Sequence, residues 1–140
     1  MSVEENKGIA RRIVEEFINK ADLSVADELF AEDFVNHSPG RGTTPDREGF
    51  KQFITNLRSA FPDQILTIDD LIAEGDQVVL RMTGRGTHTG DFGIIPATGK
   101  QFEVPLISIL RFANGKAVER WNVSDEVSLL QQLGIIPAMG

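Results

Sequence analysis

The chain contains no cysteine and no tyrosine, and it has only one tryptophan and two histidines. The lack of cysteine excludes disulfides, thiolate metal ligands and cysteine nucleophiles. The lack of tyrosine excludes a phenol as acid catalyst. No apolar run approaches the roughly 20 residues that a membrane-spanning helix requires. Residues 1–5 are acidic and polar, unlike a secretory signal, so we predict a cytoplasmic protein.

Basic charge is also scarce, because 14 Lys and Arg residues stand against 21 Asp and Glu, for a formal net charge of −7. Nucleic-acid binding needs clustered Lys and Arg to displace counterions, and anionic membrane surfaces attract the same side chains. The sequence therefore predicts no nucleic-acid partner and no membrane partner. Its 140 residues suit a single domain, 1–140, with one core of its own.

Several familiar motifs are missing. There is no Gly-x-Ser-x-Gly elbow, no phosphate loop and no His-Glu-x-x-His helix. The glycines of residues 84–99 lie in a strand and a loop, without the strand-to-helix setting of a dinucleotide site. A two-His-one-carboxylate set of His37, His88 and Asp125 is conceivable, but no short-range ligand spacing supports it. We therefore predict no cofactor and no metal.

The hydrophobic pattern changes from helix-like to strand-like along the chain. Ile9, Ile13 and Phe17 follow the spacing of an amphipathic helix over residues 3–19. A short second helix is expected after an N-cap at Ser24, and a third over residues 46–60. Strands are predicted over residues 65–73, 77–89, 102–112 and 117–125, and a closing helical segment over 126–133. This order predicts an α+β fold, with three N-terminal helices packed on one face of a mostly antiparallel sheet.

The dipeptide Asn114-Gly115 is a strong signal for a two-residue hairpin turn. Such a turn places Ser108 opposite Trp121, and alternation then assigns alternate residues to one face. That face is the more apolar, so we predict that it lines a pocket; it comprises Val104, Leu106, Ser108, Leu110, Glu119, Trp121, Val123 and Asp125. The opposite face is expected to point outward; it carries Ile107, Ile109, Arg111, Val118, Arg120 and Asn122.

Asp125 has two interpretations. A carboxylate at the end of an apolar strand face loses hydration and becomes a candidate for proton transfer. Alternatively, Ser124-Asp125-Glu126 resembles a helix start, with Asp125 as N-cap. His88 alternates with Leu80 and Met82, so it is a candidate proton carrier or hydrogen-bond donor in the same cavity, or a structural histidine.

Segments along nearly the whole chain resemble the SnoaL-like polyketide cyclases. In chain order they are Ala31 to Pro39, Phe61-Pro62-Asp63, Gly75-Asp76, Gly86 to Gly90, Pro96 to Lys100, Arg111 to Lys116, Glu119 to Trp121 followed by Asp125, and Gln132-Leu133-Gly134. The resemblance implies a cone-shaped α+β barrel with a strongly curved sheet, similar in fold to nuclear transport factor 2-like proteins, around a deep apolar cavity.

The resemblance also implies a cofactor-free polyketide ester cyclase, which closes a ring of an aromatic polyketide ester by intramolecular aldol condensation, with Asp125 as general acid/base. We predict Asp125 and His88 as catalytic residues acting on a small apolar or aromatic substrate. The predicted substrate-binding residues are His37, Trp121, Val104, Leu106, Met82 and Phe34.

Two other functions stay open. A limonene-epoxide hydrolase-like enzyme would combine Asp125 with Arg81 or Arg111 and a second acid such as Asp69 to activate water. A non-catalytic module would bind a small apolar ligand or serve as a dimerisation domain. The apolar outer sheet face predicts a homodimer in each case.

Overall fold

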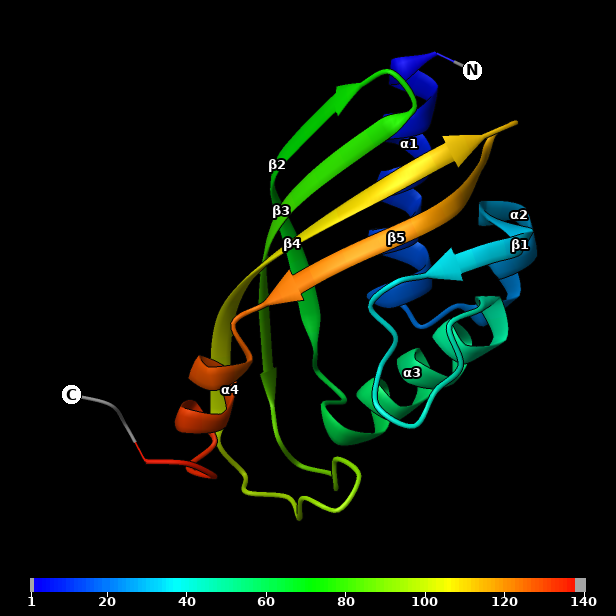
Figure 1. Cartoon of the computed structure of the whole chain (residues 1–140). Coiled ribbons are helices and arrows are strands. Elements are labelled where there is room, and N and C mark those ends of the chain that lie inside the picture. Colours follow the sequence, from blue (N-terminus) through cyan, green and yellow to red (C-terminus); the bar gives the residue numbers. More distant parts are fainter. Residues whose placement is uncertain (1, 138–140) are drawn as a thin grey trace.

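The computed structural model describes residues 2–137 and begins with one long helical segment (Figure 1). Helix α1, Val3–Arg12, is capped by Ser2 and continues into the π-helical segment η1, Ile13–Ile18. The predicted helix over residues 3–19 is therefore confirmed, with a π-helical second part. Within residues 2–137 no helix is long and apolar enough to cross a membrane.

The next segment differs from the prediction at two points. Asp22, and not Ser24, caps the 3-10 turn η2, Leu23–Val25, which leads into the short helix α2, Ala26–Leu29. The chain then enters strand β1, Phe30–Asn36, which was not predicted. Phe30 and Phe34 are both buried and four residues apart, a spacing that a helix also produces, so the apolar pattern did not indicate a strand.

Helix α3, Arg47–Ala60, follows the N-cap Asp46, whose Oδ1 accepts the Gly49 N–H at 2.8 Å. Four strands follow: β2, Ile65–Glu74; β3, Gln77–Thr87; β4, Gln101–Ala113; and β5, Lys116–Ser124. The short helix α4, Glu126–Gln132, ends the described fold. The sheet order is β1-β5-β4-β3-β2, with β1 parallel to β5 and the other pairs antiparallel. The predicted α+β class is confirmed.

The hairpin turn is confirmed, because Asn114 and Gly115 both have positive φ, but the predicted register of β5 is wrong. Val118 is an extra residue in β5, a bulge just after the turn that shifts the pairing by one. The shift turns Trp121 and Val123 to the outer face. The observed pairs are Phe112 with Ala117, Arg111 with Glu119, Leu110 with Arg120, Ser108 with Asn122, and Leu106 with Ser124.

The inner side of the sheet packs on two separate hydrophobic clusters. The larger lies under α1, η1 and α3 and centres on Phe17, Phe30 and Phe50, whose ring centroids are 5.0 to 5.5 Å apart. The smaller joins the end of α3 to β4 and the C-terminal end of α4, and comprises Ala60, Phe61, Phe102, Val104 and Leu133. Figure 1 shows α4 beside the lower half of β4, and Leu133, at the end of α4, joins the smaller cluster.

Candidate functional site

Polar side chains line the inner face of β5, where the predicted register had placed apolar ones. Arg120, Asn122 and Ser124 share the inward side with Leu110, Ser108 and Leu106 of β4. Because a strand rises about 3.3 Å per residue, successive inward residues lie roughly 6.6 Å apart. These polar groups face the interior because the bulge at Val118 shifts the register of β5 by one residue.

Arg120 is buried, with 9% of its surface exposed. Its guanidinium carbon lies 4.6 Å from the centre of the Phe50 ring. Its Nη1 donates to Oδ1 of Asn36 at 3.2 Å and to the carbonyl of Ser38 at 3.3 Å. No carboxylate pairs with it within the described residues, and desolvation lowers the pKa of Arg120 to about 10. The side chain thus stays a cation at neutral pH, without a counter-ion.

Asn122 connects β5 to β4 and to the loop after β1. Its Oδ1 accepts the hydroxyl hydrogen of Ser108 at 2.6 Å, and its backbone N–H donates to Oγ of Ser38 at 2.9 Å. With Oδ1 occupied, the side-chain Nδ2 has no partner between residues 2 and 137. Its two hydrogens are available to a ligand.

Half-buried apolar side chains flank this polar row. Phe53 of α3 and Leu106 of β4 lie at the margin of the larger cluster, and Leu57 of α3 and Leu129 of α4 lie at the margin of the smaller one. None of the four is fully buried, so apolar surface stays exposed at the margins of both clusters. An apolar wall with a few hydrogen-bond donors is typical of a small-molecule site.

Asp125 follows directly after β5 and is exposed. Its Oδ1 accepts the backbone N–H of Ser128 at 2.9 Å, and its own N–H donates to the carbonyl of Pro105 at 3.2 Å. The capping interpretation is confirmed, and the expected burial at the end of an apolar strand face is wrong. Its Oδ2 makes no hydrogen bond within the described residues. The catalytic assignment of Asp125 stays a prediction.

His88 is fully buried at the base of the loop that joins β3 to β4. Its Nδ1 accepts the backbone N–H of Thr98 at 3.3 Å and lies 3.0 Å from the hydroxyl of the same residue. The ring packs on Phe61 at 5.3 Å between centroids. Nδ1 is thus an acceptor, which leaves the proton on Nε2, and this atom is sealed without a partner in the described chain. These contacts favour a structural role, in which His88 holds the loop between β3 and β4. The predicted role of His88 as proton carrier stays a prediction.

His37 and Trp121 come together, but on the outer side of the sheet. Their rings stack with centroids 4.8 Å apart and planes 10° apart. Nε2 of His37 lies 2.7 Å from a carboxylate oxygen of Glu119, which also pairs with Arg111. These bonds, the one from His37 foremost, lower the pKa of Glu119. The predicted placement of Trp121 on the pocket face is wrong because of the bulge at β5.

The remaining predicted residues fall into two groups. Met82, Val104 and Leu106 point inward from β3 and β4, and Phe34 is part of the larger cluster. The arginines of the hydrolase alternative have other partners. Arg81 pairs with Asp69 and Asp70, and Arg111 pairs with Glu119. Neither arginine forms an ion pair with Asp125 within the described residues. No group of three metal-ligating side chains forms in the part of the chain that the structure describes.

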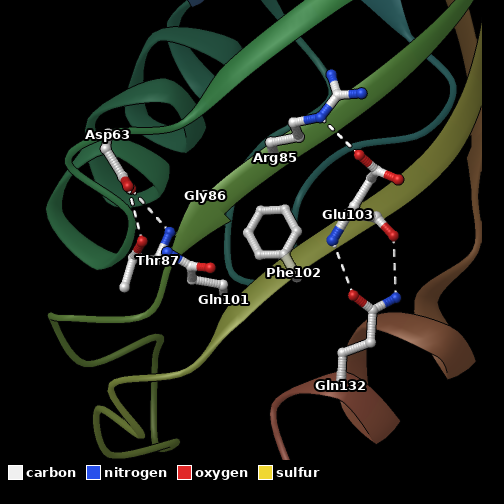
Figure 2. Close-up of a pocket in the computed structure, with 8 residues that line it drawn as sticks. All are labelled: Asp63, Arg85, Gly86, Thr87, Gln101, Phe102, Glu103 and Gln132. Carbon is white, nitrogen blue, oxygen red and sulfur yellow. Dashed lines mark hydrogen bonds and ion pairs between the residues drawn. The ribbon is translucent and has the colours of Figure 1, made fainter.

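A hollow of about 400 Å³ lies at the lower end of β3 and β4. Figure 2 shows that its polar groups bind one another: Asp63 accepts two hydrogen bonds from Thr87, and Arg85 pairs with Glu103. Gln132 bonds the backbone of Glu103. Because these groups are already satisfied, we do not place the functional site there. A second hollow, of about 320 Å³, lies at the opposite end, by Asn6 and Asn114.

Comparison with known families supports the fold. The sequence pattern of the SnoaL-like polyketide cyclases matches residues 8–133. The chain belongs to the SnoaL-like polyketide cyclase family. No curated protein sequence matches it.

Several solved structures resemble this SnoaL-like protein over almost their whole length. TsrD from Streptomyces laurentii has 29% identity and a TM-score of 0.87, with 97% of this chain and 99% of that chain covered. AclR from Streptomyces galilaeus, described as a proposed hydroxylase, has 31% identity and a TM-score of 0.85 over 99% and 87%. IdmH from Streptomyces antibioticus, described as a proposed polyketide cyclase, has 36% identity and a TM-score of 0.81 over 92% and 98%.

Sequence reasoning missed the polar row of this SnoaL-like fold. Arg120 and Asn122 were assigned to the outer face, and Ser38 and Asn36 were not considered. One signal was available: Arg120 and Asn122 alternate with Trp121, so a shift of one residue exchanges the two sets. A bulge without glycine leaves no mark in the sequence that would indicate this shift.

Proposed function

We propose that this protein catalyses a cofactor-independent cyclisation or isomerisation of a small carbonyl compound on the inner face of β5, with Asp125 as general acid/base. The observation that carries the proposal is the geometry of Asp125. One carboxylate oxygen is anchored by the helix N-terminus, and the other makes no hydrogen bond within the described residues, directly after the strand that carries Asn122. An anchored carboxylate with one free oxygen is oriented for proton transfer.

In the proposed reaction, Oδ2 of Asp125 removes a proton from the carbon between two carbonyl groups of the substrate. The resulting enolate carbon attacks another carbonyl of the same molecule, which forms the ring bond and leaves an alkoxide. The protonated Asp125 returns its proton to this alkoxide, so substrate and product have the same atoms. Nδ2 of Asn122 donates a hydrogen bond to the developing enolate oxygen, and such donors lower the barrier.

The apolar wall orients the substrate in this mechanism. Phe53 and Leu106 are half-buried, so an aromatic or polyketide-like skeleton that covers them gains by the burial of apolar surface. The bound skeleton excludes water from the reacting carbonyls and limits the conformations of the chain.

The test is exchange of the acidic C–H of an aromatic 1,3-diketone with deuterium in D₂O, followed by NMR. Asp125→Asn keeps the helix cap and removes the base, so we expect exchange to slow by about 10² or more, toward the uncatalysed rate. Glu126→Gln, the neighbouring exposed acid, is the matched control and should exchange at the rate of the unaltered protein. Equal rates for the Asp125→Asn variant and the unaltered protein would leave a binding module as the better proposal.

We also propose that a second copy of the chain covers the outer sheet face. Ile107 is 47% and Val123 76% exposed, and they are paired neighbours beside Ile109 and Trp121. Ion pairs of both signs border this strip, among them Arg111–Glu119, so a like surface is not repelled despite the net charge of −7. Light scattering should give twice the chain mass for the unaltered protein and a single chain mass for Val123→Asp.

The cytoplasm stays the predicted compartment.

A further inference from the structure

We infer that the hollow of about 320 Å³ beside the start of α1 is a second ligand site, which binds a carboxamide group carried on an apolar ring. The residues that line it are Asn6, Gly75, Asp76, Phe112, Ala113 and Asn114. Asn114 precedes β5 and Asp125 follows it, so this site and the proposed catalytic residue lie at opposite ends of that strand. The inference therefore goes beyond the proposed function.

Asn6 is a polar residue in a position that favours an apolar one. It lies on α1 four residues before Ala10, so both side chains leave the helix on the same side. Asn6 is 3% exposed and Ala10 0%. The buried stripe of an amphipathic helix is normally apolar. A leucine of similar volume would fill the position without a polar atom, so packing alone does not explain Asn6.

The side-chain amide of Asn6 has no hydrogen-bond partner within the described residues. Its Oδ1 is enclosed and unpaired, which costs the fold free energy. Its Nδ2 is also unpaired, but the enclosed unpaired atoms of the described chain are Oδ1 of Asn6 and Nε2 of His88 alone. Nδ2 is therefore accessible, and the hollow is the space that Asn6 lines. A ligand oxygen in the hollow can accept a hydrogen bond from Nδ2.

Asp76 and Asn114 supply the other polar side chains of the hollow. Oδ2 of Asp76 lies 3.7 Å from Nη1 of Arg111, and Oδ1 has no partner in the described part of the chain. The side chain of Asn114 makes no hydrogen bond between residues 2 and 137. Figure 1 shows the β2–β3 turn, which contains Asp76, close to the start of α1. A donor on Asn6 and an anionic acceptor on Asp76 thus face one cavity.

These two groups select the chemistry of the ligand. A carboxylate accepts from Nδ2 of Asn6 but is repelled by Asp76. An amidinium donates to Asp76, but it cannot accept from Nδ2 and is repelled by Arg111. A ketone accepts and cannot donate. A carboxamide does both, because its oxygen accepts from Nδ2 and its N–H donates to Oδ1 of Asp76.

The size and the apolar lining of the hollow fit a compound with one ring. Phe112 and Ala113 line the hollow and supply apolar contacts for such a ring. The volume of about 320 Å³ is at the lower end of the range for small-molecule sites. The ligand class is therefore a small aromatic or alicyclic carboxamide.

A structural role for Asn6 is the competing explanation. Such a role requires the amide to hold α1 on one of the two turns by a hydrogen bond, and residues 2–137 contain none. A structural role also predicts that Asn6→Leu lowers the urea midpoint. Removal of an unpaired buried amide predicts the opposite, a midpoint that is equal or higher.

The experiment compares four ligands of nearly the same shape: benzamide, benzoate, benzamidine and acetophenone. Each is titrated into the ¹⁵N-labelled full chain, and NMR follows the side-chain NH₂ of Asn6 and the backbone N–H of Asp76. We expect benzamide to bind with a dissociation constant on the order of 1 mM, at least about fivefold more tightly than each of the other three. No shift with benzamide, or equal affinity for all four ligands, would overturn the inference.

Two variants locate the effect. Asn6→Leu should abolish the preference for benzamide without lowering the urea midpoint. Asn56→Leu is the matched control, because Asn56 is exposed on α3 and bonds only to Gln52, and it should keep the preference. If Asn6→Leu retained the preference for benzamide, the assignment of the site to this hollow would be wrong.

Asp76→Asn decides the question independently, including the case in which Asn6→Leu does not fold. This variant removes the charge that repels an acid, so benzoate should then bind about as tightly as benzamide. An unchanged order of the four affinities in Asp76→Asn would contradict the inference.

Discussion

Replacement of Gln132 by alanine is expected to loosen helix α4 from the sheet. Strand β5 ends at Ser124, opposite Leu106, so the lower part of β4 has no neighbouring strand on that side. The side-chain amide of Gln132 takes the place of one. Its Oε1 accepts the N–H of Glu103 at 2.8 Å, and its Nε2 donates to the carbonyl of the same residue at 2.9 Å (Figure 2).

The size of the effect follows from these two bonds and from a third, which Nε2 of Gln132 donates to Oγ of Ser128 within α4 at 2.9 Å. A neutral hydrogen bond contributes about 0.5–1.5 kcal/mol, and the lower part of this range applies because Glu103 is exposed. The loss should therefore be about 1–2 kcal/mol, which for a chain of this size lowers the thermal midpoint by roughly 4–8 °C. Leu133, 2% exposed in the smaller cluster, keeps the helix partly attached, so we expect loosening and not complete loss.

Urea denaturation and hydrogen exchange at the Glu103 amide measure this. The amide should exchange at least about tenfold faster in Gln132→Ala, because its acceptor is gone. Gln131→Ala is the matched control, since the side chain of Gln131 makes no hydrogen bond within the described residues. If both variants were equally stable and the Glu103 amide exchanged at the same rate in each, the amide of Gln132 would not hold α4.

Two further predictions concern stability. Bonds from Thr87 lower the pKa of Asp63, and those from His37 and Arg111 lower that of Glu119. Above their unfolded pKa values, near 4, both acids therefore contribute their full stabilisation to the fold. This stabilisation is lost as the pH falls through the lower pKa values of the folded state. A urea midpoint that stays constant from pH 6 to 2 would contradict this prediction. Gly90→Ala should cost about 1–3 kcal/mol in urea denaturation, because a Cβ would lie 2.1 Å from a backbone oxygen of α3. Gly8→Ala in α1 meets open space and should be neutral or stabilising.

Much of the architecture was predictable because the signals are local. The cap of α3 at Asp46, the turn at Asn114-Gly115 and the alternation along β3 each depend on a few neighbouring residues. β1 was not predictable in the same way. Its pairing with β5 is made over more than 80 residues of sequence, and its apolar spacing also fits a helix.

The site was less predictable than the fold because one inserted residue inverted it. Val118 changes which face Trp121 and Arg120 occupy, and nothing in the sequence marks the bulge. The inward residues of β4 were predicted correctly, since no irregularity lies between them and the partner strand β3. Of the two interpretations of Asp125, the N-cap is confirmed, and the burial on which the other relied is wrong because the residue is exposed.

A crystal structure of the protein with an aromatic 1,3-diketone would test the location of the site directly. We predict that the rings lie on the inner face against Leu106, with one carbonyl oxygen at Nδ2 of Asn122. A ligand stacked against Trp121 on the outer face, or seated in the hollow beside Asp63, would contradict it.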